Sequence, residues 1–356
     1  MMIKRRLPAL LLALATWATG TAAMAAQPLP ALGADLSHTT VSGFSSGGFM
    51  AAQIATAYSS AFTGVAVIAG GPYDCASTYP KLGYLQNATG ACMSPVARVV
   101  GPDARVSWRN AQQYAQEGNI DAVSNVARQR VYLATGQKDQ VVRSTVTDQV
   151  EQYYLLAGVA PSAIRYRSSP DAGHGFITGN ADDAPCDASQ VPYLNNCGFS
   201  QAAELLQHVR GADSQPPRQG ALSGMIIQFD QQEFITGHRS SLDGNAYAYV
   251  PRDCVAQACT VHVAFHGCLQ GASRVGDRFY SRAGYNAYAD TNRMIVLYPQ
   301  VQVSPRIPVN PMGCWDFWGY SSEGQQPPPF QTRTAPQMVA VMAMLKRLGQ
   351  PRAVAP

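Results

Sequence analysis

The sequence has little charge and lacks the patterns of a disordered or membrane-spanning chain. Only 13% of its 356 residues are charged, against about 25% in an average soluble domain, while 46% are hydrophobic. This balance excludes an intrinsically disordered protein, which needs much charge and little apolar matter. After residues 7–18, no stretch approaches the roughly 18 unbroken apolar residues that indicate a membrane span. We therefore expect the mature protein to be soluble.

The net charge gives no reason to expect a polyanionic partner. It is +4 for the whole chain, but Lys4, Arg5 and Arg6 lie in an N-terminal leader. Without these three, 23 basic and 22 acidic side chains remain, a net charge of +1. Since nucleic acids and anionic membranes attract strongly basic proteins, neither is expected as a partner.

Residues 1–26 have the three parts of a secretory signal peptide. A basic start is followed by the apolar run 7–18 and by Ala-Met-Ala at 23–25, an A-x-A cleavage site. The alternative is an N-terminal membrane anchor, but the apolar run is shorter than the ~20 residues that a span requires. We expect a mature chain that begins at residue 27 and is secreted, to the periplasm or outside the cell.

All eight cysteines lie in the mature part of the chain. An even number of cysteines in an exported protein predicts disulfides. No pair has the C-x-x-C spacing and no histidine is spaced for zinc, so neither a metal nor another cofactor is expected. Eight cysteines allow on the order of 100 connectivities, among which sequence proximity favours one set. Its pairs are Cys75 with Cys92, Cys186 with Cys197, Cys254 with Cys259, and Cys268 with Cys314.

The first half of the mature chain has an alternating α/β pattern. Residues 39–44, the continuous apolar run 65–69, and residues 130–135 and 164–167 predict strands. Residues 46–58, 145–157 and 201–209 predict helices. Strands that alternate with helices indicate a mostly parallel sheet. The polar stretch 211–220 separates this half from the next.

The second half opens with strands instead. Residues 224–229, 246–250 and 260–265 predict a meander that leads into the sheet. A helix at 285–291 then precedes an apolar strand at 294–298, and an amphipathic helix at 335–348 is the last element. Because the chain has no internal repeat and no long linker, we expect a single α/β domain over residues 27–356.

Residues 43–47 read Gly-Phe-Ser-Ser-Gly and match the motif G-x-S-x-G. In α/β hydrolases this motif forms the sharp turn between a strand and a helix that exposes a serine nucleophile. The motif alone is weak in a chain with 31 glycines, but a predicted strand precedes Ser45 and a helix of small residues follows it. The alternative is a Gly-rich turn in which Ser45 only caps the helix.

A serine nucleophile requires a base, and the base requires an acid that orients it. In α/β hydrolases the order along the chain is Ser, Asp or Glu, then His. Of the six histidines, only His174 follows Ser45 in a flexible loop directly after a predicted strand, which makes it the candidate base. The alternative for His174 is an ordinary surface histidine.

Asp139 is the candidate acid. It lies where the strand 130–135 meets its loop, the usual position of site residues in open α/β sheets. One predicted helix and one predicted strand separate it from His174, as a βα unit requires. Asp171 is the second choice, but it lies only three residues before His174 and is expected to shape that loop.

The two oxyanion donors are expected from distant parts of the chain. Ser46 would give the first main-chain N–H. The mature chain begins too close to Ser45 for an upstream loop to give the second. Residues 263–270 predict a strand that ends in His266-Gly267, the form that oxyanion loops of lipases take, so Cys268 is expected to donate there. The alternative is an ordinary turn after a buried strand.

The order of these elements predicts circular permutation. In an unpermuted α/β hydrolase, the helix at 335–348 would lead directly into the nucleophile strand. Here that helix ends the sequence and the strand begins the mature chain. Folds tolerate this rearrangement because their termini often lie close together. We therefore predict a circularly permuted α/β-hydrolase fold with a mostly parallel sheet.

Several motifs resemble the catalytic domains of poly(3-hydroxybutyrate) depolymerases, of the type in which the oxyanion residue follows the triad. They are the segment 43–47, Phe-His-Gly-Cys-Leu-Gln at 265–270, Tyr-Ala-Asp-Thr-Asn at 288–292, Leu-Tyr-Pro-Gln at 297–300 and Gly-Cys-Trp-Asp-Phe-Trp-Gly-Tyr at 313–320. The similarity covers nearly the whole mature chain. It implies the triad Ser45, Asp139 and His174, with Cys268 at the oxyanion hole.

The resemblance implies a monomeric serine esterase that cleaves short-chain-length polyhydroxyalkanoate through an acyl-enzyme. Secreted members of the family usually add a linker and a polymer-adsorbing domain, whereas this sequence ends at Pro356. Soluble oligomers or amorphous polymer are therefore the expected substrates. Trp315 and Trp318 are expected either to grip the aliphatic ester units or to form a core cluster.

Two other functions stay open. One is a secreted esterase that acts on acetyl or feruloyl esters of plant polysaccharide, because a fold does not fix a substrate. The other is a non-catalytic binding protein on a hydrolase scaffold.

Overall fold

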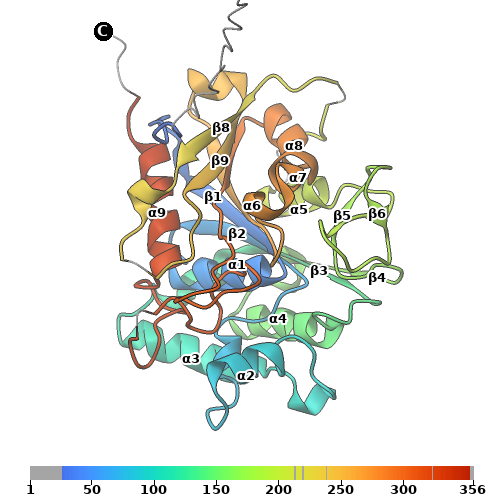
Figure 1. The fold of residues 1–356 in the computed structure, drawn as a ribbon, viewed down its shortest axis with the longest axis vertical. Coiled ribbons are helices and arrows are strands. Elements are labelled where there is room, and N and C mark those ends of the chain that lie inside the picture. The colour runs from blue at the N-terminus through green and yellow to red at the C-terminus, as the bar shows by residue number, and fades with distance from the viewer. Residues whose placement is uncertain (1–25, 212–213, 219, 238, 323, 353–356) are drawn as a thin grey trace, which may run out of the picture.

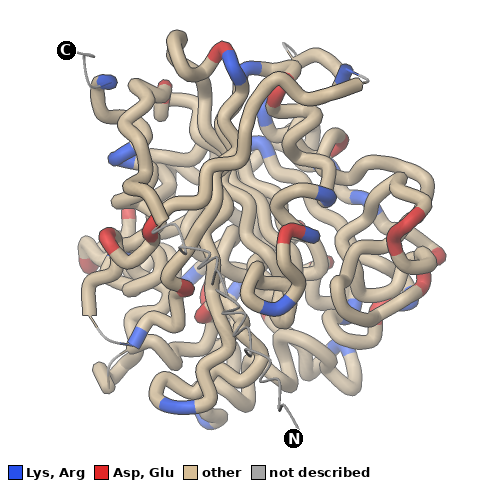
Figure 2. Tube along the Cα trace, turned by 45° about the horizontal axis from the view of Figure 1, so that its top comes forward, with Lys and Arg blue, Asp and Glu red and all other residues tan. Residues whose placement is uncertain are grey.

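A computed structural model describes residues 26–352 except 212–213, 219, 238 and 323. The predicted signal peptide, residues 1–26, therefore lies almost wholly outside the described residues. The described chain forms an eight-stranded sheet with helices on both faces and a separate three-stranded sheet at one side (Figure 1). Basic and acidic residues are intermixed along the chain trace (Figure 2).

The large sheet has the strand order β4-β3-β2-β1-β10-β11-β9-β8. From β4 to β11 all neighbours are parallel, whereas β9 and β8 pair antiparallel at one edge. The strands are β1 (Asp35–Phe44), β2 (Phe62–Ile68), β3 (Arg130–Gly136), β4 (Ile164–Ser169), β8 (Met225–Asp230), β9 (Asn245–Val250), β10 (Thr260–Phe265) and β11 (Met294–Tyr298). The small sheet comprises β5 (Phe176–Thr178), β7 (Leu194–Asn196) and β6 (Ala184–Pro185).

Alternate residues of the central strands face two separate apolar cores, as the two-residue period of a strand requires. In β2, Val65 and Val67 belong to one core, and Ala66 and Ile68 belong to the other. Helices α1 (Ser46–Ala57), α3 (Ala104–Gln116), α4 (Ser144–Leu156) and α9 (Pro336–Gly349) contribute to the first. Helices α5 (Gln201–Arg210), α7 (Arg278–Arg282) and α8 (Tyr285–Thr291) contribute to the second. Two short helices, α2 (Tyr84–Thr89) and α6 (Ala272–Val275), lie in loops.

The predicted circular permutation is confirmed by the position of β1, the strand that precedes Ser45. Strand β1 lies at the centre of the sheet and pairs parallel with β2 on one side and with β10, from the second half of the chain, on the other. Just before β1, the main-chain N–H of Gly33 donates to the carbonyl oxygen of Gln350, directly after α9. The last helix therefore ends where the first strand begins.

The predicted meander at 224–265 is correct for its first two strands and wrong for its third. Strands β8 and β9 form an antiparallel pair, but β9 pairs next with β11. Strand β10 lies beyond β11, parallel to it and to β1. The reason is burial: Val261, Val263 and Phe265 are completely buried against one core, and His262 and Ala264 face the other side, where Ala264 joins the second core.

Four disulfides join the four pairs that sequence proximity favours, Cys75 with Cys92, Cys186 with Cys197, Cys254 with Cys259, and Cys268 with Cys314.

In the described part of the chain, no helix has the length and apolar character needed to cross a membrane.

Candidate active site

Ser45 lies in the sharp turn between β1 and α1, with φ 54° and ψ −123°. Its main-chain N–H donates to the carbonyl oxygen of Ile68 at the end of β2. The turn requires the flanking glycines, since a Cβ on Gly43 would collide with the carbonyl oxygen of Gly47. A Cβ on Gly47 would in turn lie 2.5 Å from the carbonyl oxygen of His266. The turn is thus packed directly against the end of β10.

His174 follows β4 in a loop that the small sheet holds in place. Its main-chain N–H donates to Ser189 Oγ. Cβ atoms on the glycines at 173 and 175 would collide with the main chain of Asp187 and the side chain of Asn195, respectively. The disulfide between Cys186 and Cys197 closes the segment that presses on the loop. The main chain on both sides of His174 is therefore held by close packing.

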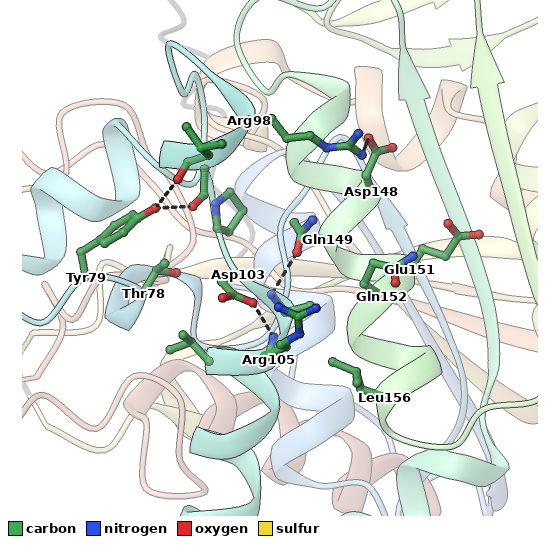
Figure 3. Close-up of a pocket in the computed structure, with 15 residues that line it drawn as sticks. Thr78, Tyr79, Arg98, Asp103, Arg105, Asp148, Gln149, Glu151, Gln152 and Leu156 are labelled. Atoms are coloured by element: carbon green, nitrogen blue, oxygen red, sulfur yellow. Dashed lines mark hydrogen bonds and ion pairs between the residues drawn. The ribbon is translucent and has the colours of Figure 1, made fainter.

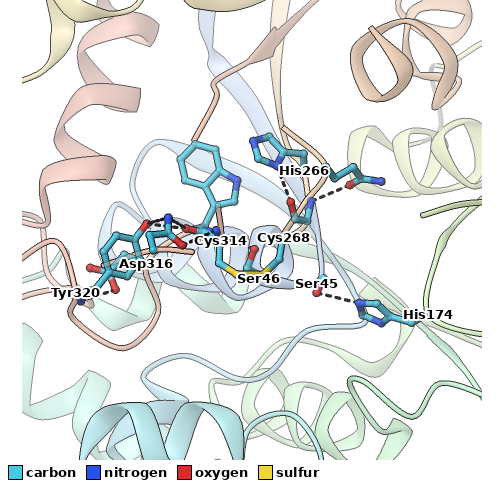
Figure 4. Close-up of a disulfide and its surroundings, with 12 residues drawn as sticks. Ser45, Ser46, His174, His266, Cys268, Cys314, Asp316 and Tyr320 are labelled. Carbon is cyan, nitrogen blue, oxygen red and sulfur yellow. Dashed lines mark hydrogen bonds between the residues drawn. A yellow bond between two sulfur atoms is a disulfide. The ribbon is translucent and has the colours of Figure 1, made fainter. Parts of the chain in front are cut away.

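Asp139, His174 and Ser45 form a buried hydrogen-bonded chain. Asp139 Oδ2 lies 2.7 Å from His174 Nδ1. His174 Nε2 lies 3.0 Å from Ser45 Oγ, and Figure 4 shows this second bond. The main-chain N–H groups of Val141 and Val142 donate to the other carboxylate oxygen. All three catalytic candidates are at most 4% exposed. The three follow β1, β3 and β4, parallel strands of one sheet whose carboxyl ends lie at the same edge.

Asp171, the second choice for the acid, has a different environment. Its side chain is 77% exposed and pairs with Lys138 Nζ at 3.3 Å. Such an exposed carboxylate does not orient the buried ring of His174. His262, in the middle of β10, is fully buried and bonds to Thr40 and Ser42 instead. His238 lies outside the described residues.

The loop after β10 lies against Ser45, as the permuted order predicts. A Cβ on Gly267 would lie 2.8 Å from Phe44 Cδ1 and 3.3 Å from Ser45 Cβ. The N–H groups of Gly267 and Leu269 are both used, by Gln270 Oε1 and by the carbonyl oxygen of Met312. The amide between them belongs to Cys268.

Two main-chain N–H groups remain beside Ser45. In the hydrogen bonds found among the described residues, neither the N–H of Ser46 nor that of Cys268 has an acceptor. Ser46 begins α1, where N–H groups lack intrahelical partners. Cys268 and Ser45 line the same pocket. Two unused donors next to a serine hydroxyl are what an oxyanion requires.

The pocket above Ser45 has a volume of about 700 Å³ and a mostly apolar wall. Ser45, His174 and Cys268 form its floor, and the wall is contributed by α2, the loop 307–314 and the aromatic segment after it. The apolar wall includes Leu85, Met93, Val141, Tyr193, Ile307, Pro308, Val309, Met312, Phe317 and Trp318. Among the described residues, no group of three or more His, Cys, Asp or Glu side chains is placed to hold a metal.

Known proteins are similar to this chain in both sequence and fold. No protein-family model matches the chain. The Polyhydroxybutyrate depolymerase of Talaromyces funiculosus is 35% identical over 346 residues, which cover 93% of this chain and 95% of that protein. The chain belongs to the polyhydroxybutyrate depolymerase family.

Two solved structures are similar in fold to this chain, and each has 32% sequence identity with it. Each similarity covers 91% of this chain and 99% of the solved chain. One is a serine-to-alanine PHB depolymerase complexed with an R3HB trimer, with a TM-score of 0.80. The other is the PHB depolymerase from Penicillium funiculosum, with a TM-score of 0.79. The Poly(3-hydroxybutyrate) depolymerase of Delftia acidovorans is 38% identical over 329 residues. This match covers 91% of our chain but only 62% of that relative, so the chain spans less than two thirds of it.

The two tryptophans expected to bind substrate lie in different environments in this depolymerase-family chain. Trp318 lines the pocket with Ser45. Trp315 is completely buried, packs against the rings of Phe265 and His266, and lies in the core. The expectation that Trp315 forms a substrate wall is therefore wrong.

Asp316 organises this aromatic segment of the depolymerase-family pocket. Its buried carboxylate accepts main-chain N–H bonds from residues 318–321 and the hydroxyl bond of Ser321. Burial raises the pKa of Asp316 despite these donors.

Sequence reasoning missed Tyr193 and the apolar residues of the loop 307–312, which also line the pocket. The signal available in the sequence was the series of apolar residues among prolines in the loop 307–312.

A second, more polar hollow of about 810 Å³ lies between α3 and α4, away from the depolymerase-family site (Figure 3). Its polar groups largely bond to one another: Arg98 pairs with Asp148 at 3.0 Å, and Gln149 accepts from the N–H of Ala104. It contains none of the catalytic candidates.

Proposed function

We propose that this chain is a serine esterase that hydrolyses the ester bonds of short-chain-length polyhydroxyalkanoate, poly(3-hydroxybutyrate) or its oligomers. The observation that carries the proposal is the buried chain Asp139–His174–Ser45 on the floor of an apolar pocket. Membership of the family supports the substrate class, since one solved relative is complexed with an R3HB trimer.

The proposed reaction uses the hydrogen-bonded chain of Asp139, His174 and Ser45. His174 Nε2 accepts the proton of Ser45 Oγ while the oxygen forms a bond to the ester carbonyl carbon. The carbonyl oxygen gains negative charge and accepts hydrogen bonds from the N–H groups of Ser46 and Cys268. The carbon–oxygen bond of the ester then breaks, and His174 returns the proton to the leaving hydroxyl group. Water repeats these steps on the acyl-enzyme and releases the acid.

Asp139 holds the base in the required tautomer. Its Oδ2 accepts a hydrogen bond from Nδ1–H of His174, which leaves Nε2 free to accept the serine proton. The N–H groups of Val141 and Val142 fix the carboxylate itself. The negative charge of Asp139 stabilises the imidazolium that forms during the reaction.

The pocket wall agrees with an aliphatic substrate. Short hydroxyalkanoate units have small alkyl side groups, and the apolar side chains around Ser45 offer contacts for them. We expect Trp318 to contact these units directly. A charged or strongly hydrated substrate would find few partners on this wall.

We further propose that the chain is exported and works as a monomer. Residues 1–26 would be removed as a signal peptide, and residues 27–356 would form one catalytic domain. The four disulfides support an oxidising compartment.

The test uses Ser45→Ala with 3-hydroxybutyrate trimer, amorphous polymer and p-nitrophenyl butyrate. We expect kcat to fall by several orders of magnitude with unchanged circular dichroism, and a fluorophosphonate probe to label the wild type alone. Retained activity would refute the mechanism. Faster hydrolysis of acetylated xylan than of the trimer would instead favour a polysaccharide esterase, and failure of the wild type to react with the probe would favour a binding protein.

A further inference from the structure

We propose that His266 and Gln270 are positioning residues of the esterase, which hold Gly267 at both of its main-chain polar atoms and so direct the Cys268 N–H toward Ser45. This inference rests on the proposed function. It concerns two buried side chains that need not touch the substrate, of which His266 is labelled in Figure 4.

The argument starts from the planarity of the peptide bond. In a trans peptide, the C=O of one residue and the N–H of the next point in opposite directions. The Gly267–Cys268 bond is not among the cis bonds of the described chain. Whatever binds the Gly267 carbonyl oxygen therefore fixes the direction of the Cys268 N–H. A rotated peptide would present an oxygen where a donor is needed.

His266 binds that carbonyl oxygen. Its Nδ1 lies 2.7 Å from the oxygen, and its Nε2 lies 3.2 Å from the main-chain nitrogen of Val301. Because the Val301 N–H can only donate, Nε2 must be the acceptor and the proton must be on Nδ1. Burial lowers the pKa of His266 to about 4, so the ring is neutral and keeps this tautomer at neutral pH.

Gln270 binds the other side of Gly267. Its Oε1 accepts from the Gly267 N–H at 2.8 Å, and its own main-chain N–H reaches the Gly267 oxygen at 3.3 Å. Its Nε2 donates to the carbonyl oxygens of Pro192 and Tyr193, at 2.9 and 3.2 Å. The side chain is completely buried.

Gln270 thereby joins the oxyanion loop to the surroundings of the base. The ring of Tyr193 lies 5.7 Å from the ring of His174 in an edge-on arrangement, and both residues line the pocket. The same amide thus contacts the loop that carries the Cys268 donor and the segment that packs on the base. Loss of Gln270 would loosen both partners of Ser45 together.

The test compares variants of the full chain on p-nitrophenyl butyrate. Removal of one oxyanion donor costs about 10²- to 10³-fold in kcat, so misdirection of the Cys268 N–H by His266→Leu should cost about 10- to 100-fold. KM should change by less than about threefold, because the donor acts mainly in the transition state. His266→Asn, which keeps a donor near the position of Nδ1, should recover most of kcat. Gln270→Met should lose about tenfold.

A second readout separates positioning from general destabilisation. Ser45 Oγ adds to the boron of butylboronic acid while the serine proton passes to His174, and the anionic tetrahedral boronate places one hydroxyl oxygen where the oxyanion develops. Its inhibition constant should rise in proportion to the loss of kcat. His262→Leu is the matched control, since His262 lies in β10, is equally buried and does not contact Gly267. It should lower the melting temperature and leave kcat within about twofold.

The possible outcomes separate the two proposals. An active Ser45→Ala enzyme would overturn the proposed function itself. An inactive Ser45→Ala together with a folded His266→Leu of wild-type kcat and boronate affinity would overturn only the positioning role. If His266→Leu does not fold, Gln270→Met decides in the same way, and unchanged kcat and boronate affinity in that variant would contradict the proposal.

Discussion

The main-chain N–H of Leu32 donates a hydrogen bond of 3.1 Å to the carbonyl oxygen of Leu348. The N–H of Ala34 donates to the same oxygen at 3.0 Å. These bonds attach the segment before β1 to the end of α9, although the two are encoded at opposite ends of the sequence (Figure 1). They replace the covalent connection that an unpermuted hydrolase has between its last helix and its nucleophile strand.

The permutation should be reversible by protein engineering. We expect a chain of residues 221–352, a Gly/Ser linker of about ten residues and residues 27–210 to fold with a melting temperature within a few degrees of the wild type. Such a linker spans about 17 Å on average, and kcat should stay within about tenfold. The control carries the same linker at the C-terminus of the unpermuted chain. A permutant that stays unfolded while this control folds would show that the two ends cannot be joined.

The acid can be distinguished from its exposed neighbour by a pair of matched substitutions. Asp139→Asn should lower kcat by about 10³- to 10⁴-fold, because an amide can donate to Nδ1 and leave the base in the wrong tautomer. Asp171→Asn should change kcat by less than twofold, since that carboxylate bonds only to Lys138 among the contacts found in the described chain. Steady-state rates on p-nitrophenyl butyrate measure both. Equal losses in the two variants would refute the assignment.

The parts of the fold that sequence reasoning predicted are those with strong local patterns. Helix α1 is buried throughout and strand β2 at every position except Thr63, so both have runs of mostly apolar or small residues. Helix α3 has no such signal: its buried residues are Ala104, Ser107 and Ala111, which do not form a stripe of large apolar side chains. The strands of the small sheet are two or three residues long, too short for a period to be visible.

Some residues of the candidate site could likewise be predicted from local sequence patterns, and others could not. Ser45, Asp139 and His174 could be located because each follows a recognisable strand in the order that hydrolases require. Trp315 and Trp318 are three residues apart in one loop, and only tertiary packing decides that the first is buried while the second faces the pocket. The role of Gln270 depends on contacts with a segment almost 80 residues away in sequence, which no local pattern encodes.

The two tryptophans should therefore respond differently to substitution. Trp318→Ala should raise KM for the hydroxybutyrate trimer by about tenfold, since a contact of this kind contributes about 1–2 kcal/mol, with little change in melting temperature. Trp315→Ala should instead cost about 3–5 kcal/mol of stability, as is usual for a fully buried aromatic. Trimer kinetics and chemical denaturation separate the two effects. A destabilised Trp318→Ala with unchanged KM would contradict the position of Trp318 in the pocket.

Asp74 should make the stability of the protein depend on pH. It is fully buried after β2, where Ser77 Oγ and Asn110 Nδ2 donate to its carboxylate at 2.6 and 2.7 Å. Burial nevertheless raises its pKa from 3.8 to about 7. The folded state therefore keeps a proton that the unfolded chain releases near pH 4. The stability that this proton gives is complete below pH 4 and is lost as the pH rises through 7.

The complete loss of this stabilisation lowers the free energy of unfolding by about 4 kcal/mol. The pKa of Asp74 differs by about three units between the folded and unfolded states, and each unit corresponds to about 1.4 kcal/mol. Asp74→Asn carries no titrating proton, so its stability should fall less than that of the wild type between pH 4 and pH 7. At pH 8 the variant should be the more stable of the two, because it no longer requires a buried charge. Denaturant midpoints measured across this range, with the exposed Asp171→Asn as the control, test the prediction. Parallel pH profiles for wild type and Asp74→Asn would show that another group carries the dependence.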